Sequence, residues 1–162
     1  MGGSSTVGNV TPVAEFNLWA DPHAAAMVFE SGARLQMCGL NLTQQFWVDS
    51  STVSALRSMN SAAGEFAAGL FEFYIAGSAA RTGLPRAPLH DPCAVLALTH
   101  PELITGTRYP VTVSTADGAT RGMTIVDQRH STGKAEANCL VFETIDRARA
   151  MDVFLSAVAA FA

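Results

Sequence analysis

Three polar side chains near the start of the chain have the types needed to hold a sugar. Asn9 follows a glycine in a loop-like stretch, and Glu15 and Asn17 flank Phe16 in the segment AEFN. If this segment is extended, alternate residues point the same way, so Glu15 and Asn17 share one side. A carboxylate and two amides beside an aromatic ring suit a polyhydroxylated ring, because each hydroxyl needs donors and acceptors. The simpler interpretation, which spacing alone favours, is a turn asparagine and two solvated side chains.

The dipeptide His90-Asp91, which a proline follows, is the second candidate. Aspartate before proline at a helix start is most simply an N-cap, and Asp21-Pro22 repeats the pattern where no chemistry is suspected. Alternatively, Asp91 binds a hard cation through its oxygens while His90, which titrates near neutrality, donates a proton beside it. The pattern alone favours the cap. The remaining histidines are expected at surface or capping positions: His23, His100 and His130.

The elements that must position these residues alternate between helices and strands. Caps and helical spacing of apolar residues predict helices over residues 22–31, 50–59 and 62–80 and from Asp91 and Asp146 onward. Short apolar runs predict strands over residues 35–40 and 138–144, and YPVTVS and GMTIVDQ, on either side of Asp117-Gly118, predict a hairpin near the C-terminus. Residues 82–90 predict a loop, because they contain two prolines and a glycine. This order indicates an α/β fold.

The helix faces are also predicted by spacing. In the helix over residues 62–80, one apolar face is expected to carry Phe66, Leu70, Phe73, Tyr74 and Gly77. In the terminal helix, one stripe is expected to carry Ala148, Met151, Leu155, Val158 and Phe161. No internal repeat or linker is visible, so residues 1–162 are expected to form a single unit.

Composition excludes several classes of partner. Lys and Arg number only 10, without clusters, and the net charge is -4, which argues against nucleic acid and against an anionic membrane surface. Charged residues interrupt the most apolar region before it reaches the ~20 residues of a membrane span. Three dispersed cysteines indicate neither a zinc site nor a disulfide framework, so a cytoplasmic location is expected. The charged share of 15% is low, so some apolar surface is expected to be covered by another chain or another copy.

The first residues allow two further interpretations. M-G-G-S-S-T fits the short pattern for N-myristoylation, which would make the protein a lipid-anchored adaptor. Glycines at positions 2, 3 and 8 would suit a phosphate-binding loop, but the Gly-Lys-Ser/Thr ending of such loops is absent.

Taken together, several of these pieces resemble the C-terminal half of an inosine-uridine preferring nucleoside hydrolase. The pattern GN-x5-EFN-x3-DP-x-AA, VFESG before a buried strand, and HDPCAVLAL occur in the order and spacing of that family. The resemblance implies an open, mostly parallel sheet flanked by helices, with the active site at the carboxyl ends of the strands. It also implies a calcium-dependent enzyme that hydrolyses the N-glycosidic bond of ribonucleosides to ribose and free base.

The resemblance assigns a role to each candidate residue. Asn9, Glu15 and Asn17 would hold the ribose hydroxyls, with Met1 beside the sugar and Phe16 lining the pocket. Asp91 would ligate calcium, and His90 would be the acid that protonates the departing base. Calcium would hold a water that a carboxylate deprotonates for attack on a sugar with oxocarbenium character.

The family's aspartate-rich motif, D-x-D-x-G-x-D-D, has no counterpart here. Because calcium takes about six to eight oxygens, Asp91 alone cannot complete a site. The chain is therefore expected to be weak or inactive alone, and to associate with itself or with a missing N-terminal half. The alternative is a non-catalytic remnant, or a module that binds or oligomerises. Base preference is not readable, and residues 78–90 are the segment to inspect for it.

Overall fold

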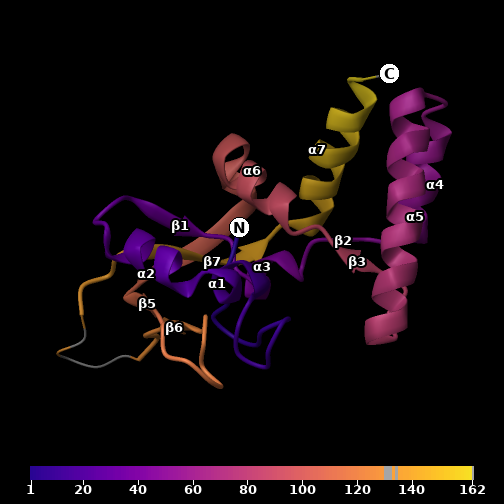
Figure 1. Cartoon of the computed structure of the whole chain (residues 1–162). Helices are drawn as coiled ribbons and strands as arrows, with labels where there is room; N and C mark the ends of the chain where they lie inside the picture. The colour runs from indigo at the N-terminus through magenta and orange to yellow at the C-terminus, as the bar shows by residue number, and fades with distance from the viewer. Residues whose placement is uncertain (130–132, 134, 162) are drawn as a thin grey trace. The chain divides into compact units, whose positions relative to one another are not determined.

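The computed structural model describes residues 1–129, 133 and 135–161, and they form two compact units. The first unit comprises Met1–Thr43 and His90–Thr144, and the second comprises Gln44–Leu89 and Ile145–Ala162. Figure 1 shows the course of the chain through both units. The single-unit organisation expected from the sequence stays a prediction.

The first unit is built on a three-stranded sheet. Its elements, in chain order, are α1 (Phe16–Ala20), α2 (Pro22–Glu30), β1 (Leu35–Met37), α3 (Leu40–Thr43), α6 (Asp91–Thr99), η1 (Pro101–Leu103), β4 (Ile104–Tyr109), β5 (Val111–Val113), β6 (Thr124–Val126) and β7 (Cys139–Ile145), whose last residue falls in the second unit. The strand order is β1-β7-β4, and β1 pairs parallel with β7, with Leu35 opposite Cys139. The predicted α/β fold is therefore confirmed.

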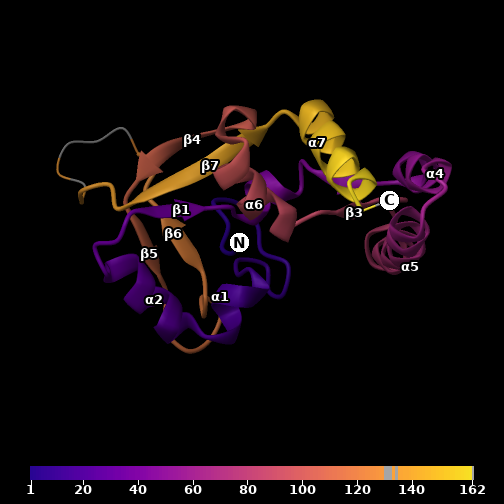
Figure 2. The ribbon, with the colours of Figure 1, turned by 90° about the horizontal axis from the view of Figure 1, so that it is seen from above.

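The hairpin β5–β6 packs with the sheet around one core. Val111 pairs antiparallel with Val126, so the predicted hairpin near the C-terminus is confirmed, although its two strands are short. Helix α2 packs against β5, and Figure 2 shows α1 and α2 on the side of the hairpin. The core of this unit brings together the buried residues Met37, Val111, Cys139 and Val141. Apolar strands and one face of α2 thus enclose a common interior.

The second unit consists mainly of helices. Its elements are β2 (Trp47–Val48), α4 (Ser50–Ser58), α5 (Ala62–Thr82), β3 (Ala87–Pro88) and α7 (Arg147–Ala159). Helix α4 begins with a capping box, in which the Asp49 carboxylate accepts the backbone N–H of Thr52 while the Thr52 hydroxyl accepts from the backbone of Asp49. Helix α5 ends at Gly83, whose φ of 75° is the left-handed conformation that closes many helices.

The packed face of α5 differs from the predicted one. The helix packs through Ala68, Phe71 and Ile75 against α4 and α7, in a core that also contains Val53 and Leu56. The predicted face is instead largely open to solvent, with Phe66 71%, Leu70 53% and Phe73 82% exposed. The prediction is wrong because α5 is apolar around most of its circumference, so spacing alone cannot select one side.

Three other local predictions need correction. The segment AEFN is not extended, because α1 begins at Phe16. The strand predicted over residues 35–40 ends at Met37 and is followed by α3. The predicted loop over residues 82–90 contains β3, which pairs antiparallel with β2. In addition, no described helix combines the length and the apolar character needed to cross a bilayer.

Candidate functional site

The carboxylate of Glu15 organises the N-terminal loop of the first unit. Glu15 is the N-cap of α1: Oε1 accepts the N–H of Asn17 at 2.8 Å, and Oε2 accepts those of Leu18 at 3.3 Å and Gly3 at 3.0 Å. The side chain is only 2% exposed. Three backbone donors therefore satisfy a buried charge, which would otherwise be costly. Glu15 is therefore not solvated, and although its own backbone is extended, α1 begins at the next residue, so Glu15 and Asn17 do not lie on one side of an extended stretch.

The other residues of the predicted sugar site gather around this cap. The Asn9 Oδ1 accepts the N–H of Phe16 at 2.9 Å, and the Asn17 Nδ2 donates to the carbonyl of Met1 at 3.3 Å. Phe16 is 54% exposed, and the side chains of Asn9 and Asn17 are exposed as well. An aromatic ring and two amides thus stand at the surface above a buried carboxylate, as a site for a hydroxylated ligand requires.

The loop that carries Met1 reaches this position through Gly3. Gly3 has φ 72°, and a Cβ on it would lie 2.9 Å from both Met37 Sδ and Thr124 Cγ2. The N–H of the next residue, Ser4, donates to the Thr124 hydroxyl at 2.8 Å. Only glycine combines this conformation with so close an approach. The glycine at position 3 is therefore explained by packing on β1 and β6.

His90 lies in the same unit and has a specific partner. Its Nδ1 lies 2.7 Å from the Oγ1 of Thr43, the last residue of α3, and Thr43 is fully buried. Burial lowers the pKa of His90, while the negative charges of Asp91 and Glu15 act in the opposite direction. The side-chain partner found for His90 among the described residues is thus Thr43, and the effect of burial on its pKa exceeds that of the two carboxylates. Of the other histidines, His23 is exposed and His100 is the cap residue of η1, as predicted, and His130 lies outside the described residues.

Asp91 differs from Asp21 although both precede a proline. Asp21 is the N-cap of α2 and accepts the N–H of Ala24 at 2.9 Å. Asp91 instead lies inside the first turn of α6, whose N-cap is His90, and no hydrogen bond to its exposed carboxylate is found among the described residues. The cap interpretation is therefore correct for Asp21 and wrong for Asp91. The Asp91 carboxylate remains available for an external ligand.

A calcium site is not formed by the described residues. Among them, no group of three or more His, Cys, Asp or Glu side chains is placed so that it could hold a metal ion. Asp91 offers two of the six to eight oxygens that calcium takes. The cysteines lie in the interior, and burial raises the pKa of Cys93 to about 12 and that of Cys139 to about 11, so these thiols are protonated near neutrality.

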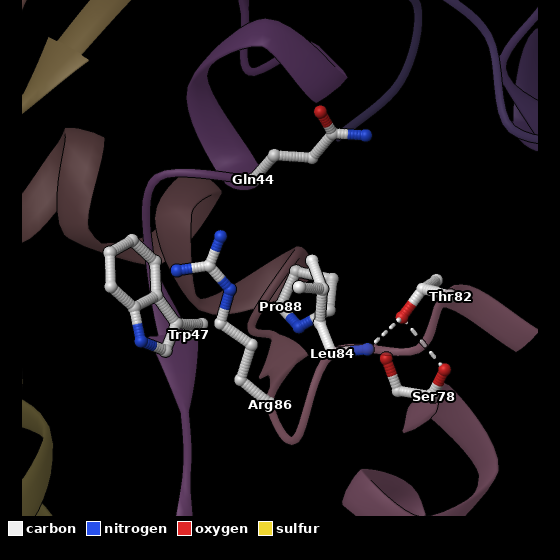
Figure 3. Close-up of a pocket in the computed structure, with 7 residues that line it drawn as sticks. All are labelled: Gln44, Trp47, Ser78, Thr82, Leu84, Arg86 and Pro88. Atoms are coloured by element: carbon white, nitrogen blue, oxygen red, sulfur yellow. Dashed lines mark hydrogen bonds between the residues drawn. The ribbon is translucent and has the colours of Figure 1, made fainter. Parts of the chain in front are cut away.

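The second unit contains a pocket of about 240 Å³, which is lined by five residues of the segment 78–90 together with Gln44 and Trp47. Figure 3 shows the Arg86 guanidinium facing the indole of Trp47, 4.2 Å from its centroid, with Ser78 and Thr82 opposite. The guanidinium of Arg147 also lies 4.1 Å from the same ring. The pocket therefore combines a cation–π wall with hydroxyl groups. Sequence reasoning missed Trp47, Arg86 and Thr43, because each acts through a partner distant in the chain.

Comparisons with known proteins agree with this geometry. The family model described as inosine-uridine preferring nucleoside hydrolase matches residues 1–152. The pyrimidine-specific ribonucleoside hydrolase RihA of Shewanella woodyi is 41% identical over 154 residues, which are 94% of this chain and 49% of that protein. The chain thus spans about half the length of the curated relatives it matches.

Solved structures are similar over the same extent. The purine-preferring ribonucleoside hydrolase from Gardnerella vaginalis has a TM-score of 0.88 and 32% identity, covering 99% of this chain and 51% of that one. A plant nucleoside hydrolase has a TM-score of 0.87 and 28% identity, with 98% and 52% covered. Sequence and fold agree, and the chain belongs to the inosine-uridine preferring nucleoside hydrolase family.

Proposed function

We propose that this chain carries the ribose-binding side of a nucleoside hydrolase and acts with the half of the fold that it does not span. The reaction is hydrolysis of the N-glycosidic bond of a ribonucleoside, which yields ribose and free base. The observation that carries the proposal is the exposed set of Asn9, Phe16 and Asn17 around the buried carboxylate of Glu15, in the same unit as His90.

In this proposal the exposed amides bind the ribose hydroxyls. Asn9 and Asn17 each offer both a donor and an acceptor, and Met1 and Phe16 provide apolar contact beside the sugar. The negative charge of Glu15 stabilises the positive character that develops on the sugar as the bond to the base breaks. Because Glu15 is held by three backbone N–H groups, it needs no rearrangement to do so.

His90 is proposed as the acid that protonates the departing base. Since Nδ1 is engaged with Thr43, Nε2 is the nitrogen left to donate. Burial lowers the pKa of His90, which makes the imidazolium a stronger acid. The negative charges of Asp91 and Glu15 offset part of this lowering.

Calcium is proposed only for the complex of this chain with the missing half. Asp91 would then supply one carboxylate, and the remaining ligands, with the group that activates water, would come from the other half. The chain by itself is proposed to bind a nucleoside without turning it over. This second function is favoured by the lack of a metal-binding cluster among the described side chains.

Two aspartates in the same sequence context allow a matched test. In a complex of this chain with the N-terminal half of the Shewanella woodyi relative, release of free base from uridine and inosine would be measured with calcium present. Asp91→Asn should abolish calcium-dependent release, whereas Asp21→Asn, which also precedes a proline, should retain it. Equal activity of the two variants would refute the role of Asp91. Both nucleosides are needed, because one relative is pyrimidine-specific and another is purine-preferring.

A further inference from the structure

The pocket of the second unit contains a positive charge that no carboxylate balances in the described part of the chain. Its lining residues all come from one segment of that unit: Gln44, Trp47, Ser78, Thr82, Leu84, Arg86 and Pro88. Arg86 is the charged member of this lining, and no ion pair of its guanidinium is found among the described residues. A guanidinium in this situation favours an anionic ligand, because its N–H groups match the oxygens of carboxylates and phosphates.

The guanidinium of Arg86 is held in place by Trp47. It lies 4.2 Å from the centroid of the indole, and Figure 3 shows it facing the ring. The indole is itself fixed, because Trp47 pairs with Pro88 across β2 and β3 and its carbonyl accepts from the Arg147 guanidinium at 3.1 Å. Stacking uses a flat face of a guanidinium and leaves the N–H groups at its edge to bind oxygens. Arg86 is therefore a pre-organised donor.

Carboxylates of the second unit have other partners. Asp49 and Asp146 cap α4 and α7 by accepting backbone N–H groups. Glu72 accepts from the Arg57 guanidinium at 2.7 and 2.9 Å. None of these three carboxylates lines the pocket. The charge that compensates Arg86 is therefore expected from a ligand.

Two neutral side chains of the pocket are also without a partner in the described part of the chain. Ser78 is only 4% exposed, yet its hydroxyl makes no hydrogen bond to another described residue, and the same holds for the amide of Gln44. Because buried hydroxyls are nearly always hydrogen-bonded, one left open in a pocket indicates a ligand. The Thr82 hydroxyl differs, since it donates to the Ser78 carbonyl at 2.9 Å and accepts the N–H of Leu84 at 3.2 Å.

We propose that this pocket binds a phosphate group, free or as the monoester of a small organic molecule, through the Arg86 guanidinium and the Ser78 hydroxyl. A phosphate supplies the negative charge that a neutral heterocycle lacks. Its three terminal oxygens suit three donor groups, the third being the Gln44 amide, better than the two oxygens of a carboxylate do. Leu84 and Pro88 offer apolar contact to an organic part. The site goes beyond the proposed function and does not depend on it, because every lining residue belongs to the second unit.

The two tryptophans give the test an internal control. Trp47 lines the pocket, whereas Trp19 lies in α1 of the first unit. The indole N–H resonances of the 162-residue chain would be followed by NMR during titration with inorganic phosphate, with uridine 5′-monophosphate and with uridine. Inorganic phosphate should shift the Trp47 resonance and leave that of Trp19 in place. The monophosphate should also shift the Trp47 resonance, whereas uridine, which lacks the phosphate, should not.

A matched pair of arginine variants tests the charge. Arg86→Gln should weaken phosphate binding by about tenfold or more, as the loss of hydrogen bonds to a charged group does. Arg81→Gln makes the same change of charge at an exposed residue of α5 that does not line the pocket, so it should leave the affinity unchanged. Ser78→Ala should weaken binding by about fivefold, the effect of one ordinary hydrogen bond, and it leaves the stacking of Arg86 on Trp47 intact.

The outcomes separate the two sources of phosphate and expose a wrong assignment. Tighter binding of uridine 5′-monophosphate than of inorganic phosphate would support a monoester as the ligand, and equal affinities would support free phosphate. A Trp47 resonance unchanged by both phosphates would overturn the proposal. So would a shift by uridine equal to that by its monophosphate, or equal losses of affinity in Arg86→Gln and Arg81→Gln.

Discussion

At the scale of residues, Glu15 caps α1 and is also proposed to stabilise positive charge on the sugar, and a stability measurement reports on the capping role separately. Its carboxylate caps α1 and fixes Gly3, so Glu15→Gln replaces an acceptor oxygen by a donor facing backbone N–H groups. The free energy of unfolding should fall by about 2 kcal/mol, the range for hydrogen bonds to a charged group. Urea denaturation followed by circular dichroism measures this change.

The matched control for Glu15 is Glu30→Gln. Glu30 is exposed at the end of α2, so this change should stay within about 0.5 kcal/mol, as surface substitutions usually do. If the two substitutions change the free energy of unfolding equally, the hydrogen bonds of the Glu15 carboxylate do not stabilise the N-terminal loop.

Thr43 should position His90 without itself contacting the nucleoside. Thr43→Val keeps the shape but removes the hydroxyl at Nδ1, so the imidazole loses the partner that fixes its orientation. In the reconstituted complex we expect kcat to fall by about tenfold with KM nearly unchanged, since a general acid contributes about 100-fold or more. Thr43→Ser should restore kcat, and equal losses for the valine and serine variants would contradict the role.

The residue types of the site could be foreseen, but their geometry could not. Asn9, Asn17 and the His90-Asp91 pair could be selected from type and family pattern. The capping bond of Glu15 to Gly3 joins residues 12 apart, and the bond of Thr43 to His90 joins residues 47 apart. Such bonds depend on the folded chain, and no local spacing encodes them.

At the scale of elements, the start of α4 should respond to pH through Asp49. A hydrogen bond from the Ser51 hydroxyl lowers the pKa of Asp49 most, and the N–H groups of Thr52 and Ser51 lower it further. A carboxyl whose pKa is lower in the folded state stabilises that state above its unfolded pKa, and loses this effect as pH falls through the folded pKa.

Asp49→Ala should therefore destabilise the protein near neutral pH by about 1 kcal/mol, the usual value of an N-cap. The difference from wild type should shrink below a pH of about 4, the ordinary value for aspartate. Thermal denaturation of both proteins between pH 3 and 7 measures how this stability difference changes with pH. Asp117→Ala, at a fully exposed side chain, should show neither effect, and a difference independent of pH would contradict the assignment.

The core of the helical unit should depend on α4 and not on the exposed face of α5. Leu56 is 0% exposed and Leu70 is 53% exposed, so the same truncation to alanine has different consequences. Leu56→Ala should cost about 3 kcal/mol because it leaves a cavity, while Leu70→Ala should cost under about 1 kcal/mol. Equal costs in urea denaturation would show that the exposed face is packed in solution.

Local signals predicted the elements better than they predicted the packing. Asp21 and Pro22 mark the start of α2, and Asp146 marks that of α7. Helix α1 spans only five residues, too few to show a period, and β2 and β3 span two each and exist through their mutual pairing. These short elements are determined by tertiary contacts, which a single sequence does not display.

At the scale of the whole molecule, the proposed catalytic site is incomplete within this chain. The first unit holds the residues proposed to bind the sugar, His90 and the Asp91 carboxylate, and the described residues form no group of three or more side chains that could hold a metal ion. Since the chain spans about half of its curated relatives, the metal and the water-activating group are expected from the other half. Activity should therefore be a property of the reassembled fold.

The most direct test is release of free base from uridine and inosine by the purified 162-residue chain, alone and with the N-terminal half of the Shewanella woodyi relative. Each mixture would be assayed with calcium and with a chelator. We expect no release by the chain alone, calcium-dependent release by the pair, and loss of that release in Asp91→Ala. Calcium-dependent turnover by the chain alone, lost in the same variant, would contradict the divided site.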